Sequence, residues 1–447
     1  MERPWGTRSS MSSQGPSTMI VVTANWEIGD GSVWPAPAAG IMGRFRADVA
    51  RAAVRAGWRA DGRYEPVPRV EIVFAGDTFD WLGSRQWLGA TRPWHRGARA
   101  RAIRARVVAR SLRAGGGIVR GMLALVRRGL HVPKPDRHGR PVPGESRRVP
   151  VGLTILEGNL DAGLTREPAR MAAERSGIGV GTAWDARGVR VVHGHGADPL
   201  WIEDDGPSLG ASLRVDLLAR FAASDAMSVI DAEARRPLLA ALRSTHPLGL
   251  AAAVAAWVAS RRDTATAGSL QEEWLRSVSA WHRAARGSGL TDAGRWSEAP
   301  FDLVEALAAR LAAIDRRPFA HRPPVGAADP LGELLGIAPP PAAPGIVVLG
   351  HAPIDTPIIP AGHRRCIALG PRQGMASDRD GHPPGVREIS LRPTAPPFPT
   401  TALVTDRGDG SSIAALGDAV AEWSLTDRRR GWSEVPVDGG AWIVDAA

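Results

Sequence analysis

Residues 69–80 read RVEIVFAGDTFD, a short apolar and β-branched run that passes directly into glycine and acidic residues. The same form, a strand-like run followed at once by glycine and polar side chains, recurs at 151–161, 189–195 and 346–353. Because sites in open α/β sheets form beyond the carboxyl ends of the strands, the four runs predict one polar cluster on an α/β sheet. Carboxylate, amide and imidazole side chains suit a divalent cation such as Mn, Fe or Zn. The first interpretation is therefore a metal site.

Further elements of this sheet are predicted at both ends of the chain. Met19 to Thr23 is a β-branched run, and it leads into a glycine-punctuated polar turn at 24–31. Residues 40–58 have apolar positions at helical spacing, so a helix is predicted there. After the middle of the chain, strand-like runs are predicted at 346–349, 365–369, 387–391, 402–405 and 411–416.

The middle of the chain has a different pattern. From Trp201 to Pro318, Ala, Leu, Arg and Trp dominate at helical spacing, which predicts a helical insertion. Residues 131–148 are predicted to form a Pro- and Arg-rich loop. The expected organisation begins with a disordered N-terminus at 1–17 and a discontinuous α/β domain at 18–200 and 345–425. The insertion at 201–322 and a Pro-rich linker at 323–344 interrupt this domain, and a C-terminal tail follows at 426–447.

The insertion is rich in tryptophan, at Trp201, Trp257, Trp274, Trp281 and Trp296. Tryptophans are more often part of a core, although they also dominate many protein interfaces. A protein partner that binds the insertion is therefore an open alternative.

Arginine supplies almost all of the positive charge. The 447 residues carry a net charge of +10, and Lys134 is the only lysine. This composition reflects either a GC-rich genome or a phosphate-rich or membrane-surface partner, because guanidinium groups bind phosphate oxygens in bidentate fashion. The strongly basic stretch 91–130 lacks the aromatic interleaving that base stacking needs, so specific nucleic-acid binding is not expected.

The sequence also bears on the cellular compartment. Cys366 is the only cysteine, which excludes an intrachain disulfide and is typical of a reducing compartment. The first 17 residues lack the apolar core of a signal peptide, and no run reaches the roughly 18 apolar residues of a spanning helix. We expect a cytoplasmic protein without a transmembrane segment.

In order, spacing and strand context, the polar motifs resemble those of the calcineurin-like metallophosphoesterase superfamily. That family has five blocks: Asp-x-His, Gly-Asp-x-x-Asp, Gly-Asn-His-Asp, a lone His often followed by Gly, and Gly-His-x-His. The corresponding stretches here are Asn25-Trp26-Glu27, Gly76-Asp77-Thr78-Phe79-Asp80, Gly158-Asn159-Leu160-Asp161, His193-Gly194-His195 and Gly350-His351-Ala352-Pro353. Trp81 after the second block is similar to the branch of the UDP-2,3-diacylglucosamine pyrophosphatases, which act on lipid A precursors. The resemblance implies an α/β fold, a metallophosphoesterase-like β-sandwich flanked by helices, with an α-helical insertion.

The resemblance also implies where metals would bind. In the family, two metals share the aspartate of Gly-Asp-x-x-Asp. One ligand set is kept here, as Asp77, Asn159, His193 and His351. The residues that complete the other set are all replaced, by Asn25, Glu27 and Pro353.

Loss confined to one ligand set predicts a site reduced to a single divalent metal, with two metals or none as the alternatives. Asn25 and Glu27 still offer oxygens as residual first-site ligands, as does Asp355. A rebuilt, oxygen-rich first site therefore stays open.

Other candidate residues flank these ligands. The position of the family's catalytic histidine in the third block is Leu160, which can neither stabilise nor protonate a leaving group. His195 and Asp161 are the candidate catalytic residues, with His195 as a substitute acid. Asp80 and Asp161 are alternatively expected to orient ligands or to cap turns, and Asp198 to orient a histidine of the 189–195 stretch.

Two functions are consistent with these motifs. The first is metal-assisted hydrolysis of a phosphoester or pyrophosphate, in a phosphorylated small molecule or lipid, by the reduced site. The alternative is a catalytically inactive protein on the same scaffold, which binds a phosphoryl ligand or a protein partner.

Overall fold

The computed structural model describes most of the chain up to residue 314 and short segments beyond it. The described residues are 18–35, 37, 40–59, 61–186, 189–195, 198–201, 207–244, 247–261, 263–288, 303–314, 346–351, 365–368, 400–406, 411–416 and 421–424. The predicted segments 1–17, 323–344, 387–391 and 426–447 lie outside them, as do Trp296, Pro353 and Asp355.

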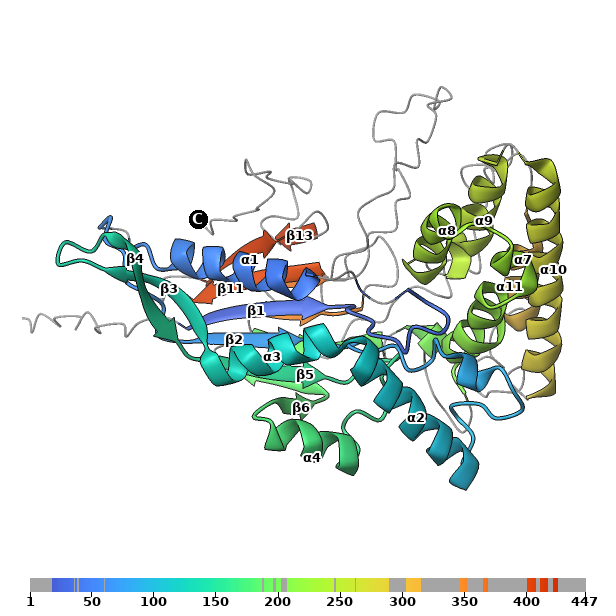
Figure 1. Cartoon of the computed structure of the whole chain (residues 1–447), viewed down its shortest axis with the longest axis horizontal. Helices are drawn as coiled ribbons and strands as arrows, with labels where there is room; N and C mark the ends of the chain where they lie inside the picture. The colour runs from blue at the N-terminus through green and yellow to red at the C-terminus, as the bar shows by residue number, and fades with distance from the viewer. Residues whose placement is uncertain are drawn as a thin grey trace, which may run out of the picture.

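A six-stranded sheet forms the centre of the α/β part (Figure 1). Its strand order is β12 (Ser411–Leu416), β11 (Thr400–Asp406), β1 (Met19–Ala24), β2 (Val70–Phe74), β5 (Val151–Leu156) and β6 (Gly179–Gly181). The strands from β1 to β6 in this order are parallel, with Val21 paired to Ile72 and Ile72 to Leu153. β11 and β12 continue the sheet in antiparallel sense. The predicted α/β class is thereby confirmed, and the central strands of the sheet are parallel.

Helices α1 (Ile41–Ala56) and α3 (Gly116–Arg128) lie over this sheet, and α4 (Glu167–Arg175) packs against its edge strand β6 (Figure 1). Helix α2 (Ala98–Ala114) packs against α3 and extends beyond the sheet. Helix α1 buries a stripe at helical spacing that includes Ile41, Phe45 and Val49. This stripe joins strand residues such as Ile72 in one apolar core. The arginines of α2 lie mainly on its exposed or half-buried positions, as expected for a solvated helix face.

A second, five-stranded sheet contains the later motifs. Its order is β13 (Ala421–Ser424), β10 (Arg365–Ala368), β9 (Ile346–Leu349), β8 (Val189–Val192) and β7 (Ala183–Ala186). β8, β9 and β10 are parallel, and the two edge strands are antiparallel to their neighbours. The two sheets approach one another beyond their parallel strands, where the His193 ring contacts the Ala75 carbonyl.

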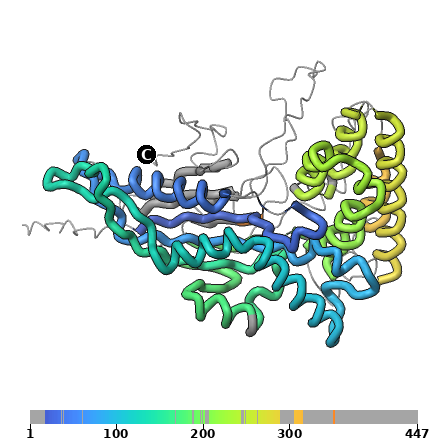
Figure 2. Tube along the Cα trace, in the orientation of Figure 1, coloured from blue at the N-terminus to red at the C-terminus, as the bar shows by residue number. Residues whose placement is uncertain are grey.

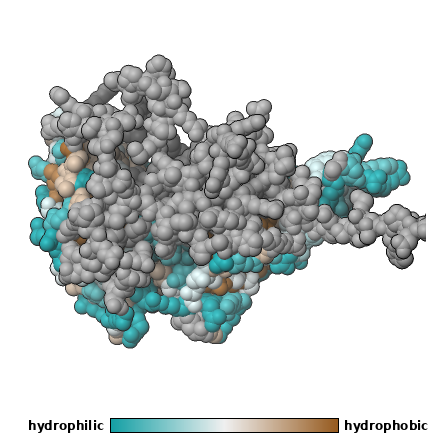
Figure 3. Space-filling view, turned by 180° about the vertical axis from the view of Figure 1, so that it is seen from behind, coloured by the Kyte–Doolittle hydropathy of each residue, from teal (hydrophilic) through white to brown (hydrophobic). Residues whose placement is uncertain are grey.

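The predicted loop at 131–148 is wrong. These residues form most of an antiparallel hairpin, β3 (Leu130–Pro135) and β4 (Pro141–Val149), that projects from the body (Figures 1 and 3). Leu130, Val132 and Val149 anchor its base in the main core. A two-stranded ribbon tolerates its prolines because each strand has an unpaired edge on which no N–H is required.

The described residues between 207 and 314 form the helical insertion, which stands at the end toward which β1 and β2 point (Figures 1 and 2). It contains α5 (Leu209–Ser212), a π-helical segment (Leu213–Ala219), α6 (Arg220–Ala222), α7 (Asp225–Ser228), α8 (Ala232–Ser244), α9 (Leu250–Ala259), α10 (Thr264–Gly287) and α11 (Leu303–Ala312). Three of its tryptophans, Trp257, Trp274 and Trp281, are buried in its core. None of the described helices combines the length and apolarity of a membrane span.

Candidate metal centre

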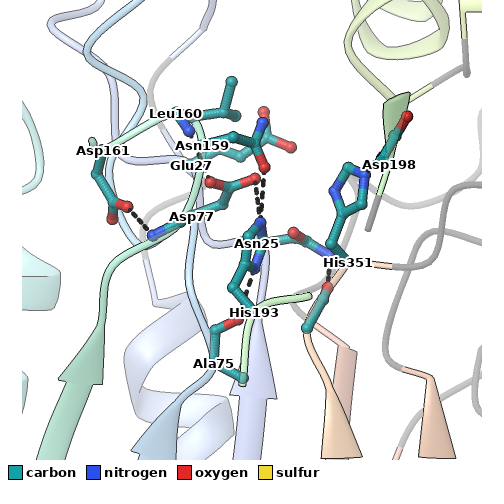
Figure 4. Close-up of polar contacts among 12 residues, drawn as sticks. Asn25, Glu27, Ala75, Asp77, Asn159, Leu160, Asp161, His193, Asp198 and His351 are labelled. Atoms are coloured by element: carbon teal, nitrogen blue, oxygen red, sulfur yellow. Dashed lines mark hydrogen bonds and ion pairs between the residues drawn. The ribbon is translucent and has the colours of Figure 1, made fainter. Parts of the chain in front are cut away.

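Polar loops from both sheets meet at one place (Figure 4). The backbone of Gly350 and His351 continues the pairing of β9 with β8, because their N–H groups donate to Val192 and His193 at 3.0 and 2.7 Å. The loop after β1 is attached in the same way to the loop after β2, since Glu27 N–H donates to the Asp77 carbonyl at 2.8 Å. The strand ends therefore place side chains that are distant in sequence next to one another.

Glycine is required in these motifs because the loops approach so closely. A Cβ on Gly350 would lie closer than 3.0 Å to the Ala75 carbonyl, and one on Gly158 closer than 3.0 Å to the Asp77 backbone and carboxylate. Real Cβ atoms essentially never show such contacts. The glycine of each motif thus allows the polar residue beside it to enter the site.

Backbone strain coincides with the site. Among the described non-glycine residues, positive φ occurs at Asn25 (57°), Glu27 (43°) and Asp77 (50°). Left-handed conformations are costly for such residues and cluster at functional sites, where surrounding structure holds them. All three were candidate site residues from the sequence.

The predicted ligands Asp77, Asn159, His193 and His351 lie together, and we call them the histidine half of the site. The Nε2 atom of His193 lies 2.7 Å from Asn159 Oδ1 and 3.3 Å from Asp77 Oδ2 (Figure 4). Ligand atoms of Asp77, His193 and His351 all lie within 4.8 Å of one another, so this group could hold a metal ion. Asp77, Asn159 and His193 are buried, and His351 is partly exposed.

The hydrogen bonds of His193 indicate which of its ring nitrogens faces the candidate metal position. Its Nδ1–H donates to the Ala75 carbonyl at 2.7 Å, because a carbonyl can only accept. Nε2 then faces two oxygen acceptors, Asn159 Oδ1 and Asp77 Oδ2, which only a proton or a cation on this side can satisfy. One nitrogen and two oxygens directed at the same position are a donor set that fits Mn, Fe or Zn.

Asp77 and His193 shift each other's pKa because they lie side by side. Burial opposes both charges, but the His193 charge and hydrogen bonds from His193 and the Leu160 N–H outweigh it and lower the pKa of Asp77. Burial is likewise outweighed at His193, where Asp77 raises the pKa. A positive charge between these residues is therefore stabilised, whether a proton or a metal ion carries it.

Asp198 orients a different histidine from the one expected. Its Oδ2 lies 2.8 Å from Nε2 of His351, and no hydrogen bond joins it to the His193 or His195 rings in the described part of the chain. Its Oδ1 accepts the Leu200 N–H, which fixes the carboxylate. A carboxylate on one ring nitrogen sets the tautomer and orientation of a metal-binding histidine.

Asp161 joins two of the motif loops. Its carboxylate oxygens accept the N–H groups of Gly158 and Phe79 at 2.7 and 3.1 Å. Burial and the nearby Asp77 charge raise the pKa of Asp161 to about 7. Because both oxygens are used to hold the backbone, this geometry favours the orienting role over the catalytic one.

His195 lies beside the candidate metal ligand His193, with its ring centroid 5.1 Å from that of His193. Burial, followed by the His193 charge, lowers the pKa of His195 to about 3. Its buried Nδ1 has no hydrogen-bond partner among the described residues. An imidazole with so low a pKa stays neutral and is only a weak base, so it can hydrogen-bond a ligand, whereas the acid role expected for it requires the protonated form.

The remaining predicted residues, Asn25, Glu27 and Asp80, are engaged by protein groups. Asn25 Nδ2 donates to the Gly350 carbonyl at 3.2 Å. Glu27 Oε2 accepts Arg214 Nη2 at 2.9 Å and Arg243 Nε at 2.6 Å. Asp80 Oδ2 accepts the same Arg214 Nη2 at 2.6 Å. We call Glu27, Asp80, Arg214 and Arg243 the arginine half of the site.

Arg214 and Arg243 were not among the residues predicted for the site. Both come from the helical insertion, Arg214 from the π-helical segment and Arg243 from α8. In an arginine-rich chain nothing in the local sequence distinguishes them, apart from the position of Arg214 between apolar neighbours. π-helical segments are rare overall, and those that occur often lie at functional sites. This one is visible only in the structure.

No protein-family model matches this chain, nor does any curated protein or any solved structure.

Proposed function

We propose that this protein is a metal-dependent hydrolase of phosphoesters or pyrophosphates, with a metallophosphoesterase-like sandwich fold and a reduced site for one Mn, Fe or Zn ion. The observation that carries the proposal is the histidine half, in which Asp77, Asn159 and His193 direct two oxygens and a nitrogen at one position. His351 completes the ligand set, and the Asp198 carboxylate orients the His351 ring.

The protein's own groups would hold and prepare the reactants. A divalent ion bound there would polarise a phosphoryl oxygen and lower the pKa of a water molecule. Asp161 holds the loops of Asp77 and Asn159 at the correct separation. His195 presents an unpartnered neutral nitrogen beside the site, which supports a role in hydrogen-bonding the substrate.

The test begins with metal content and then measures hydrolysis. The purified full chain is loaded with Mn²⁺, dialysed and subjected to elemental analysis, and is then assayed with bis(p-nitrophenyl) phosphate, p-nitrophenyl phosphate and a nucleotide pyrophosphate. We expect retained metal and turnover of at least one substrate, and loss of both in Asp77→Asn. Asp185→Asn is the matched control, because Asp185 is an exposed carboxylate paired only with Arg190 in the described structure, at 3.6 Å. Absence of metal, or an unchanged metal content in Asp77→Asn, would contradict the proposal.

A non-catalytic binding protein is the second candidate, favoured by two observations. Leu160 is buried at the position where a catalytic histidine would stand in the family it resembles. In addition, Glu27 is already neutralised by Arg214 and Arg243. Metal retention without hydrolysis of any of the three substrates, together with retention of inorganic phosphate in equilibrium dialysis, would favour this function.

A further inference from the structure

The arginine half has the composition of a cation site in which the cations belong to the protein. Three oxygens converge on two guanidinium groups, namely Glu27 Oε2, Asp80 Oδ2 and the main-chain carbonyl of Glu27, which accepts Arg243 Nη2. Carboxylate and carbonyl oxygens of this kind are the usual ligands of hard divalent cations. The position that they surround is taken by side chains of the insertion.

The ion pair between Arg214 and Asp80 is buried. The side chain of Arg214 is 6% exposed and that of Asp80 is fully buried. Burial disfavours the charged guanidinium, but Asp80 and Glu27 more than offset it and raise the pKa of Arg214. Its guanidinium also lies over the Trp34 ring, 4.9 Å from the centroid.

The charges in the arginine half also balance. Two carboxylates face two guanidiniums, so no net negative charge remains to attract a metal ion, and no free cation is offered to a phosphate. The feature that distinguishes this half from the histidine half is thus that its oxygens already have positive partners. A buried carboxylate that lost such a partner would be strongly destabilised.

We propose that the insertion's Arg214 and Arg243 replace a metal ion at Glu27 and Asp80, so that the protein binds metal in the histidine half alone. Removal of the Arg214 side chain then converts the arginine half into a divalent-cation site. The expectation that the parent binds one ion rests on the proposed function, whereas the expected gain of an ion in the variant does not. The helical insertion would on this basis complete the site electrostatically as well as cover it.

The test compares Arg214→Met with the parent in the full-length protein. Elemental analysis after Mn²⁺ loading should show one additional ion per chain in the variant. The variant should be less stable than the parent in EDTA, and Mn²⁺ should raise its unfolding temperature more than it raises that of the parent. An unchanged metal content together with an equal Mn²⁺ shift would overturn the proposal.

Arg92→Met is the matched control. Arg92 also makes a buried ion pair between the α/β part and the insertion, with Asp216 at 2.7 Å, but without a second carboxylate at the same donor atom. It should lose stability without gaining a metal ion or extra protection by Mn²⁺. Equal metal gain in both variants would show that loosening the insertion suffices, and would contradict the specific role of Arg214.

A milder substitution covers the case in which Arg214→Met does not fold. Glu27→Gln keeps the size of the side chain and removes the charge that would act as a ligand. Since Glu27 holds guanidiniums rather than metal, this variant should retain the parent's metal content, and a lost ion would overturn the proposal. A parent without metal whose Arg214→Met variant gains one ion would refute the proposed function but support this inference. A parent with one ion whose Arg214→Met variant gains none would support the proposed function and refute this inference.

Discussion

The histidine half and the arginine half of the site are adjacent, and the carboxylates of both lie on strand-end loops, with Asp77 and Asp80 on the same loop after β2. They differ in what balances these groups. In the histidine half, Nε2 of His193 and the oxygens of Asn159 and Asp77 face one another, and among the described residues no arginine pairs with Asp77. In the arginine half, Arg214 bridges Glu27 and Asp80.

This difference shows that carboxylates on similar strand-end loops can have different partners. Glu27 and Asp77 both lie in strained loops after parallel strands, and their sequence contexts are equally polar. Of these two, Glu27 is the one whose described ion pairs are with arginines of the insertion. The partner supplied by a distant part of the chain therefore decides which carboxylate is available to a metal ion.

The largest effect is expected from a substitution that disturbs the frame common to both halves. Gly350→Ala places a methyl group closer than 3.0 Å to the Ala75 carbonyl and close to His193. We expect the free energy of unfolding to fall by about 3 kcal/mol, the upper end for overpacking, together with loss of metal retention. Urea unfolding followed by circular dichroism and elemental analysis measure the two effects.

Gly117→Ala provides the control for this substitution. Gly117 lies within α3, and nothing stands within 4 Å of the position of an added Cβ. Alanine should stabilise the helix there by about 0.5–1 kcal/mol. A Gly350→Ala protein as stable as the parent would show that the two sheets can separate at this point without cost.

An intermediate effect is expected from Asp198→Asn, which acts on the histidine half alone. Loss of the carboxylate beside His351 Nε2 should weaken Mn²⁺ binding by about 10- to 100-fold, because the ring loses the group that orients it. Isothermal titration with Mn²⁺ measures the affinity, with Asp185→Asn as the control. The Arg214→Met gain of metal should persist in the double variant, and an abolished gain would mean that the two halves are not separate sites.

The smallest effect concerns His195 and pH. Its folded pKa, lowered to about 3, lies below the ordinary value of 6.5, so the unfolded chain binds the proton first as the pH falls. The stability that His195 contributes is present above pH 6.5 and is lost as the pH falls toward 3. The loss should be about 1 kcal/mol over the first pH unit below 6.5, and His195→Asn should remove it.

Urea unfolding in EDTA at several pH values would measure this difference. Asp161 contributes in the opposite sense, since its pKa is raised to about 7 and its stability contribution is lost as the pH rises toward that value. Because parent and variant share Asp161, the difference between their pH profiles isolates His195. Parallel profiles would mean that the His195 ring is accessible to protons in the folded state.

Much of the α/β frame could be predicted because its signals are local. The β-branched runs at 19–23, 70–74 and 151–156 are strands, and the amphipathic pattern at 40–58 is α1. The hairpin at 130–149 was missed because its prolines and arginines are typical of loops. Pairing with a second strand and three anchored apolar residues decided its structure instead.

The amino-acid sequence by itself determined which side chains stand at the strand ends, since Asp77, Asn159, His193 and His351 each follow a strand-like run. The meeting of these ends depends on how the two sheets come together. It also determined that glycine stands beside each close approach. Only the tertiary structure decided that Glu27 and Asp80 hold guanidiniums and that Asp198 orients His351. Ion pairs between residues that lie more than a hundred positions apart depend on how the insertion packs, and no local pattern specifies that packing.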